Sequence, residues 1–116
     1  MDVSGLAVPR SKESEVYDYI ISECATIADY LPTTPTTNAA RATRWAALML
    51  KARAAVYAGS LANYNNKMAS PIRTEGNEVG IPAEMATSYY ETALETAKEV
   101  ISQASAYYNL NVTVPN

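Results

Sequence analysis

The stretch Arg41–Ser60, RATRWAALMLKARAAVYAGS, constrains the fold more than any other part of the chain. It contains seven alanines, the only tryptophan and four of the nine Lys and Arg residues. Alanine has the highest helix propensity, and runs of Val, Ile and Thr that favour strands are nearly absent from the 116 residues. The sequence therefore predicts an all-α fold. This helix could seek a membrane, read nucleic acid through its basic residues, or pack closely between neighbours.

The first helix is predicted over residues 12–31. Ser11 is its expected N-cap, acidic residues follow in the first turn, and Pro32 stops it because the residue before a proline resists the helical region. Apolar residues recur at spacings of four and three, which is one face of a helix. That predicted apolar face consists of Val16, Ile20, Cys24, Ile27 and Leu31.

The second helix, predicted over residues 40–64, follows a polar, proline-rich connector. Its candidate caps are Thr37, Asn38 and Thr43. Gly59 is the position at which a bend or an early stop could occur, because glycine lowers helix propensity. Its expected bulky side consists of Trp45, Met49, Ala52 and Val56, and its small-residue side of Ala47, Ala54, Ala58 and Leu61. A helix that is apolar nearly all round is buried between neighbours. We therefore expect the second helix to be the central one.

The third helix is predicted over residues 83–105 and opens after Pro82, a residue that suits a helix start. Its apolar face is expected to consist of Tyr90, Ala93, Leu94, Ala97, Val100, Ile101 and Ala104. Residues 65–81 between the second and third helices form a long surface loop. A loop of this length is either functional or a disordered insertion.

Charge argues against two of the explanations for the stretch 41–60. Arg41, Arg44 and Lys51 fall within a sector of about 80° of the helix, with Arg53 on the far side. The net charge is −3 and the charges are scattered, whereas a nucleic-acid-binding domain usually carries a basic stripe. The longest uncharged helical stretch, residues 54–66, is shorter than the roughly 20 residues of a membrane span. We therefore expect neither nucleic-acid binding nor a transmembrane segment.

Composition also limits the chemistry. The chain has no histidine, which excludes His-based catalysis and His-rich metal sites, and Cys24 is interpreted as a buried core residue. The row Glu91, Glu95 and Glu99 is interpreted as a solvated face and not as a metal site. Two tyrosine pairs, Tyr89–Tyr90 and Tyr107–Tyr108, are interpreted as half-buried, although stacking on sugar rings is an alternative. No catalytic residue, metal ligand or cofactor is predicted, and the ligand-binding residues are left unknown.

Two sequence blocks and a third, weaker segment resemble the SusD/RagB family of surface nutrient-binding lipoproteins. The first block matches at Pro9, Arg10, Ser11, Val16, Tyr17, Ile20, Leu31 and Pro32. The second matches at Arg41, Ala42, Thr43, Ala46, Ala47, Leu50, Lys51, Ala52, Arg53, Tyr57, Ala58 and Gly59. The segment YYETALETAKEVI is similar to a third family segment. One departure is Ala40, where the family usually has glycine, and the loop 65–81 is longer than in many members.

The resemblance implies a tetratricopeptide-like helical array that is an internal segment of a longer SusD-like chain. Family members are lipid-anchored at the outer-membrane surface of Gram-negative bacteria. They bind glycans or other nutrients and act as a lid on a partner TonB-dependent, SusC-like porin. No leader peptide follows Met1, and the resemblance places the leader and lipid anchor in a missing N-terminal part. Because family ligand pockets are built largely from other parts of the chain, no binding residue is transferred.

The residues themselves leave two other functions open. The first is a stand-alone tetratricopeptide-like adaptor that binds a peptide or protein in a groove. The second is an enzyme using Glu, Asp, Tyr, Lys or Ser, but no constellation of these residues stands out, so we expect a non-catalytic protein. A segment of a larger fold is further expected to expose apolar surface that the rest of the protein would cover.

Overall fold

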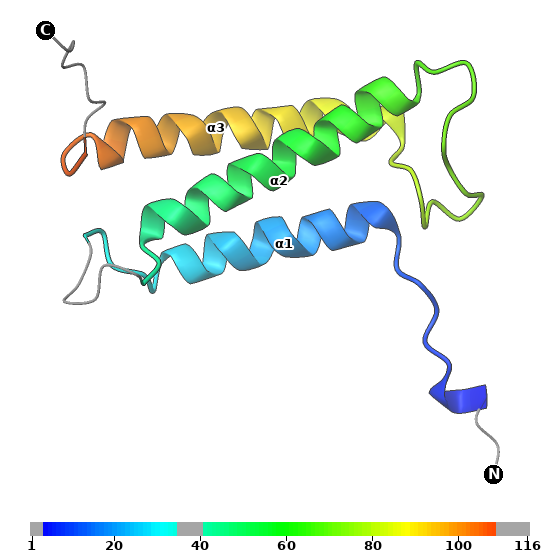
Figure 1. Ribbon diagram of the computed structural model, residues 1–116, viewed down its shortest axis with the longest axis horizontal. Coiled ribbons are helices and arrows are strands. Elements are labelled where there is room, and N and C mark those ends of the chain that lie inside the picture. The colour runs from blue at the N-terminus through cyan, green and yellow to red at the C-terminus, as the bar shows by residue number, and fades with distance from the viewer. Residues whose placement is uncertain (1–3, 35–40, 109–116) are drawn as a thin grey trace, which may run out of the picture.

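A computed structural model describes residues 4–34 and 41–108 (Figure 1). The described elements are the 3-10 turn η1 (Ser4–Leu6), the helices α1 (Glu13–Ala28) and α2 (Arg44–Asn65), the 3-10 turn η2 (Ala83–Met85) and the helix α3 (Ala86–Ala104). These residues contain helices and no strand, which confirms the predicted all-α fold class. Within the same residues, no helix combines the length and the apolar character that crossing a membrane requires.

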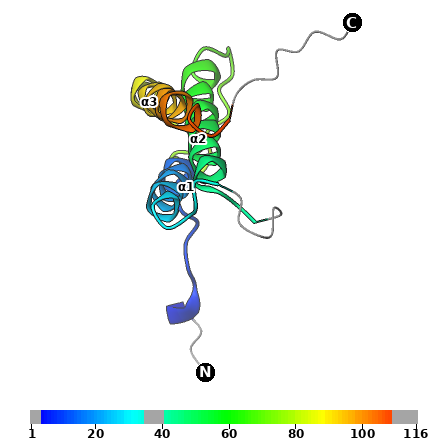
Figure 2. The ribbon, with the colours of Figure 1, turned by 90° about the vertical axis from the view of Figure 1, so that its left-hand side faces the viewer.

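The chain reverses direction at each connection, so consecutive helices run antiparallel and α2 lies between α1 and α3 (Figures 1 and 2). Both flanking helices pack on α2, whereas no Cα atom of α1 lies within 8 Å of a Cα atom of α3. The prediction that the second helix is the central one is therefore confirmed. Side chains, and not backbone contact, must join α1 to α3.

The beginning of α1 lies slightly later than the sequence predicts. Its N-cap is Lys12 and not Ser11. The Lys12 amide donates a hydrogen bond of 3.0 Å to the carboxylate of Glu15, so a side chain from the first turn satisfies one of the free donors at the helix start. The carboxylates of Glu13 and Glu15 also lie where the helix dipole favours negative charge.

The end of α1 is at Ala28, earlier than the predicted residue 31. The Tyr30 amide donates to the carbonyl of Ile27 at 2.9 Å, and the Leu31 amide donates to that of Ala28 at 3.4 Å. Bonds between residues three apart tighten the last turn, which is a common way for a helix to end. Pro32 therefore sets only the last position that the helix could have reached.

The helix α2 begins at Arg44 and not at residue 40, with Thr43 as its N-cap. Thr37 and Asn38, the other candidate caps, lie outside the described residues. An early stop at Gly59 does not occur, because α2 continues through it to Asn65, one residue beyond the predicted end. A Cβ atom at Gly59 would lie 3.0 Å from ring carbons of Tyr90 on α3. The glycine therefore allows α3 to approach α2 closely.

The third helix is preceded by a separate turn. Residues 83–85 form the 3-10 turn η2, in which the Met85 amide donates to the Pro82 carbonyl at 3.1 Å, and the α-helix begins only at Ala86. Its last residue, Ala104, is one residue before the predicted end. Pro82 thus starts the helical segment as expected, but as a tighter turn.

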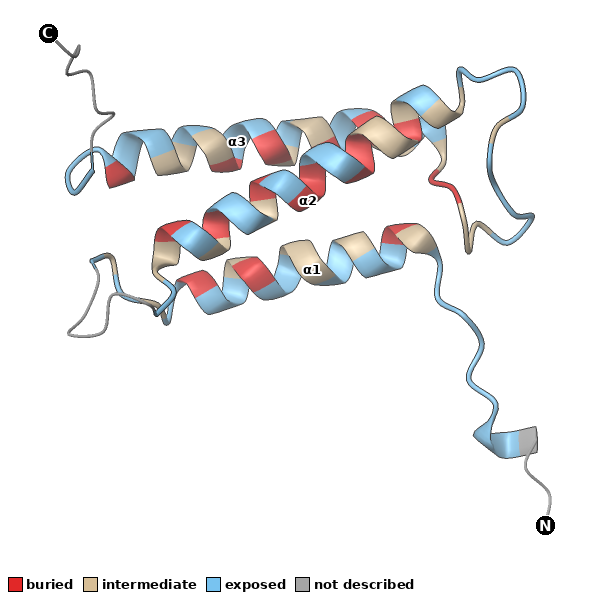
Figure 3. Cartoon of the chain, in the orientation of Figure 1, coloured by how far each residue is buried: buried red, intermediate tan, exposed pale blue. Residues whose placement is uncertain are grey.

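The core is built around alanines on the inner side of α2. Ala55, Ala58 and Ala62 have no exposed surface at all. One cluster of buried residues consists of Ala58, Ala62, Ile81, Ala86 and Tyr89, and another of Ala28, Trp45, Leu48 and Ala104. Figure 3 shows buried positions recurring along the whole of α2. Small side chains in the middle of the core let both flanking helices lie close to α2.

The predicted apolar faces are only partly buried, and this is the main correction to the sequence analysis. On α1, Cys24 is buried as expected, but Val16 and Ile27 are exposed. On α2, two members of the expected bulky packing side, Met49 and Val56, are exposed. On α3 the exposed members are Leu94 and Ile101, while Ala86, Tyr89, Ala93, Thr96 and Ala104 are buried. Each apolar arc is wider than the helix contact that covers it.

The connection between α2 and η2 is hydrogen-bonded to the end of α2 and to the start of α1. The Asn65 side chain donates to the carbonyl of Ile72 and accepts from its amide, each at 2.8 Å. The Glu13 amide donates to the carbonyl of Asn77 at 3.1 Å, and the Gly80 amide donates to the Glu13 carboxylate at 2.6 Å. The predicted long loop is therefore an ordered segment that packs against the start of α1.

Candidate interaction groove

A groove of about 890 Å³ runs between α2 and α3, and we refer to it as the α2–α3 groove. It is lined by Met49, Leu50, Ala52, Arg53, Val56, Tyr57, Tyr90, Ala93, Leu94 and Ala97. Most of these side chains are apolar or aromatic. The groove thus gathers the parts of the two apolar faces that the helix contact leaves uncovered.

The groove has a floor of small residues between two walls of larger ones. Ala52 and Ala93 are buried at its base. On the α2 wall the side chains of Met49, Leu50 and Tyr57 are 50%, 53% and 55% exposed. On the α3 wall Leu94 is 55% exposed. Apolar side chains that stand around an open floor of alanines leave room for a further side chain to enter.

Arg53 is the single charged residue among the described residues that line the groove. Its guanidinium carbon lies 5.8 Å from the centre of the Tyr57 ring, within the range of a cation–π contact. No carboxylate lines the groove within the part of the chain that the structure describes. The groove is therefore an apolar surface with one positive charge.

The tyrosine pair of α3 divides between the groove and the core. Tyr90 lines the groove, and its hydroxyl lies 3.1 Å from the Ser60 hydroxyl of α2. Tyr89 is buried, with its hydroxyl donating to the Asp18 carboxylate at 2.8 Å and lying 3.3 Å from the Ser14 carbonyl. Burial, and then the hydrogen bond to Asp18, raise the pKa of Tyr89. The sequence predicts that Tyr90 lies on the buried face, but Tyr89 is the residue that joins α3 to α1.

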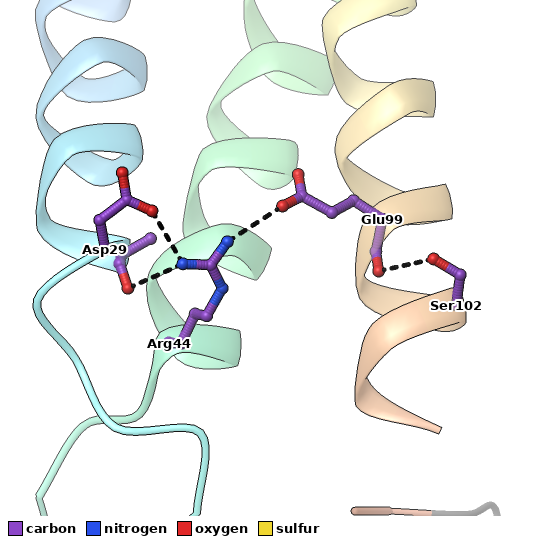
Figure 4. A network of polar contacts seen from close by, with 5 residues as sticks. Asp29, Arg44, Glu99 and Ser102 are labelled. Carbon is purple, nitrogen blue, oxygen red and sulfur yellow. Dashed lines mark hydrogen bonds and ion pairs between the residues drawn. The ribbon is translucent and has the colours of Figure 1, made fainter. Parts of the chain in front are cut away.

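A second side-chain link joins α1 and α3 at the other end of the helices (Figure 4). The Arg44 guanidinium of α2 donates to the Asp29 carboxylate at 2.8 Å, to the Ala28 carbonyl at 3.3 Å and to the Glu99 carboxylate at 3.3 Å. The hydrogen bond to Asp29 is the main cause that raises the pKa of Arg44. Arg44 is therefore an ion-pair residue of the fold.

This ion pair changes two interpretations from the sequence. Glu91 and Glu95 are exposed as expected of a solvated row, but Glu99 is half-buried and paired with Arg44. Arg44 in turn is engaged between helices and does not join Arg41 in a basic surface. Arg53 lies in the groove, so the structure does not bring the basic residues of this stretch together.

Cys24 and the pair Tyr107–Tyr108 lie outside the groove lining. Cys24 is buried, and burial, followed by the negative charge of Glu23, raises the pKa of its thiol, while Lys51 opposes the shift. Across residues 4–34 and 41–108, no three acidic, cysteine or histidine residues are grouped so that they could hold a metal ion. Tyr107 and Tyr108 are about half exposed, and the Tyr107 ring centre lies 6.0 Å from that of Trp45.

Sequence reasoning missed the groove, although its components were visible. The third helix has seven apolar positions on one face, which indicates that one neighbour would not cover them all.

Comparison with protein-family models, with curated proteins and with solved structures finds no match to this chain. The groove offers apolar contact and one cation, which are features of a binding surface.

Proposed function

We propose that this chain is a non-catalytic scaffold segment of a SusD-like surface protein that binds glycans or other nutrients. In this proposal the whole protein delivers its ligand to a TonB-dependent, SusC-like porin. A lipid anchor in another part of the protein holds it at the cell outer membrane. The support for the family is the resemblance carried by four short motifs. PRS (residues 9–11) and RAT (residues 41–43) precede α1 and α2, and LKAR (residues 50–53) and YAG (residues 57–59) lie within α2.

The observation that carries the scaffold role is the open α2–α3 groove. Soluble monomers rarely leave a large contiguous apolar surface uncovered, and such surfaces usually mark contact with another protein element. Here exposed apolar side chains stand on both walls of a groove of about 890 Å³. The three helices thus have the form of a layer against which further structure packs.

The same structure suits a supporting role better than direct ligand capture. The polar side chains with defined partners serve the fold: Arg44 and Tyr89 join helices, and Glu13 and Asn65 hold the connection. Few polar groups are left converging on the groove to recognise a sugar by hydrogen bonds. We therefore propose that oligosaccharide binding belongs to other parts of the full-length protein.

The genomic context and a binding titration test this proposal. We expect the reading frame to encode a longer chain with an upstream lipobox, next to a gene for a large TonB-dependent porin. We also expect no heat of binding when the 116-residue chain is titrated with plant or host oligosaccharides. A reading frame that encodes only these residues, or tight glycan binding by this chain alone, would contradict the scaffold role.

The groove also favours a second candidate function, a stand-alone tetratricopeptide-like adaptor that binds a peptide or protein partner. Helical arrays commonly hold such partners in grooves between antiparallel helices. The genomic test separates the two functions. An adaptor would be encoded as a complete protein without a lipobox or a neighbouring porin gene.

A further inference from the structure

We propose that the α2–α3 groove is the docking site of an amphipathic α-helix from outside this chain, and that this helix places an acidic residue against Arg53. The inference rests on the proposed scaffold role and deepens it, because it specifies what covers the open surface. Three observations carry it: the spacing of the wall residues, the alanine floor and the isolated positive charge.

The spacing of the wall residues fits a helix. On α3 the lining residues Tyr90, Leu94 and Ala97 advance by four and then by three residues. On α2 the lining residues Met49, Arg53 and Val56 advance in the same way. A row of this spacing runs nearly parallel to its helix axis and is the seam along which another helix packs. Two such seams bound one groove, so a third helix would contact both.

The floor of the groove fits the knobs of such a helix. Ala52 and Ala93 place only methyl groups between the two seams. Helix pairs pack by inserting the side-chain ridges of one into the grooves of the other, and a Leu or Ile side chain would fill the space above an alanine. An extended peptide would leave its own backbone donors facing an apolar wall without partners. The groove therefore favours a helix over a strand.

The charge of the groove fits an acidic partner. Arg53 has no carboxylate beside it in the lining, and its contact within the groove is the Tyr57 ring. Docking an apolar surface around Arg53 would remove water from the guanidinium, which costs free energy unless a carboxylate pairs with it. A Glu or Asp at the edge of the apolar face of the docked helix would supply that partner.

The same charge argues against a second copy of this chain as the occupant. A symmetric dimer pairs the same patch on both subunits. Two α2–α3 grooves brought face to face would enclose two Arg53 side chains, with no carboxylate from either lining. Like charges in one partly desolvated contact oppose association. A partner of different sequence avoids this cost.

A pair of synthetic peptides tests the proposal on the 116-residue chain. The first is a fluorescein-labelled amphipathic peptide of about five turns, with Leu at four–three spacing and one Glu beside its central Leu. The second replaces that Glu by Lys, and a third is a scrambled control of the same composition that retains helix propensity but has no apolar stripe. Fluorescence anisotropy measures the affinity of each peptide. We expect the Glu peptide to bind about three- to tenfold more tightly than the Lys peptide, and the scrambled peptide not to bind.

Charge reversal locates the binding. With Arg53→Glu the Lys peptide is expected to bind more tightly than the Glu peptide. With Arg53→Gln the two peptides are expected to bind equally. Arg41→Glu is the matched control, since it makes the same charge change at an exposed residue outside the groove lining. It should lower the affinity of the chain for each peptide only slightly and leave the ratio of the two affinities unchanged. Because both arginines are exposed, circular dichroism is expected to show the same helix content for all variants.

Several results would overturn the proposal. These are equal affinity for the Glu and Lys peptides, binding of the scrambled peptide, or equal effects of Arg53→Glu and Arg41→Glu. A dimer in sedimentation equilibrium that Leu94→Gln disrupts would make a second copy the occupant instead. Failure of the genomic test with a positive peptide result would reject only the SusD-like function. A positive genomic test with a negative peptide result would reject only the helix-docking site.

Discussion

The hydroxyl of Tyr89 on α3 donates a hydrogen bond to the carboxylate of Asp18 on α1, with 2.8 Å between the two oxygens. No Cα atom of one helix lies within 8 Å of a Cα atom of the other, so the tyrosine side chain spans the distance between them to reach its partner. Arg44 makes the corresponding link to Asp29 and Glu99 near the other end. These two polar links hold the flanking helices in register.

Removal of the Tyr89 hydroxyl is expected to destabilise the fold while leaving its ring in place. Tyr89→Phe deletes the bond to Asp18 and should lower the free energy of unfolding by about 0.5–1.5 kcal/mol. Urea denaturation followed by circular dichroism measures the change. Tyr19→Phe, on the exposed side of α1, is the matched control and should leave stability unchanged. Equal effects of the two substitutions would show that the Asp18 link contributes nothing.

The same hydroxyl predicts a loss of stability in alkaline solution. The pKa of Tyr89 is raised in the folded state, whereas in the unfolded chain it is about 10. Its stabilising contribution is therefore complete below pH 10. Above that pH the unfolded state releases the proton and the folded state keeps it, so stability falls by up to about 1.4 kcal/mol per pH unit from this group. Unfolding curves between pH 8 and 11 should show the wild type and Tyr89→Phe converging. If the difference in free energy of unfolding between the two proteins stayed constant over this pH range, the raised pKa of Tyr89 would be contradicted.

Gly59 is expected to resist replacement although it lies inside a helix. Alanine in place of glycine would gain about 1 kcal/mol of helix propensity, but its methyl group would lie 3.0 Å from the Tyr90 ring. The bond to Ser60 holds that ring in position, so we expect overpacking to prevail and Gly59→Ala to destabilise the fold by about 1 kcal/mol. Thermal denaturation tests this in two backgrounds. With Tyr90→Ala the contact with the ring is absent and only the Cβ atom of Tyr89, at 3.3 Å, remains close, so Gly59→Ala should become stabilising. Stabilisation in both backgrounds would mean that the ring moves aside freely.

The ion pairs of Arg44 are expected to make a modest, salt-dependent contribution. Arg44→Ala should lower the free energy of unfolding by about 1 kcal/mol at low salt, because the Asp29 side chain is 73% exposed and that pair is largely screened. In 0.5 M NaCl the difference should shrink. Arg41→Ala serves as the control, as Arg41 is exposed. If salt had no influence on the difference, the packing of the Arg44 side chain and not its charge would be the cause.

Glu13 is expected to protect the connection between α2 and η2 from proteolysis. Its carboxylate accepts the Gly80 amide at 2.6 Å and is the side-chain anchor of that segment on α1. Glu13→Ala should increase the rate of tryptic cleavage after Arg73, which is exposed within the segment, because local opening becomes less costly. Mass spectrometry of timed digests measures the rate. Glu15→Ala, in the same turn, is the comparison. It should leave cleavage after Arg73 unchanged, and an equal increase would indicate general fraying of α1.

The sequence predicts the helices and their order well, because alanine content and apolar periodicity are local properties. It predicts their ends less well, since these depend on which donor finds a partner. The Lys12 amide bonds to Glu15 and thereby moves the start of α1. Tertiary contact also overrides local propensity at Gly59, where the close approach of Tyr90 fixes the residue type.

The position of the α2–α3 groove could not be predicted from the sequence, for a related reason. Periodicity shows how wide an apolar arc is, but the neighbour decides which part of it is buried. On α3 the contact with α2 covers Tyr89 and Ala93 and leaves Leu94 exposed, although all three belong to one broad arc. Which residues line the groove between two helices is known only once the positions of the helices relative to one another are known.

The completely buried alanines of α2 have a consequence for how this protein can change over time. Ala55, Ala58 and Ala62 are completely buried, and interiors are close-packed, so we expect a larger side chain at any of them to require a smaller one on a flanking helix. Because α2 lies between the two, a substitution accepted on α1 alters what α3 can accept. Alignments of related chains should therefore show correlated changes between α1 and α3, two helices whose backbones never meet.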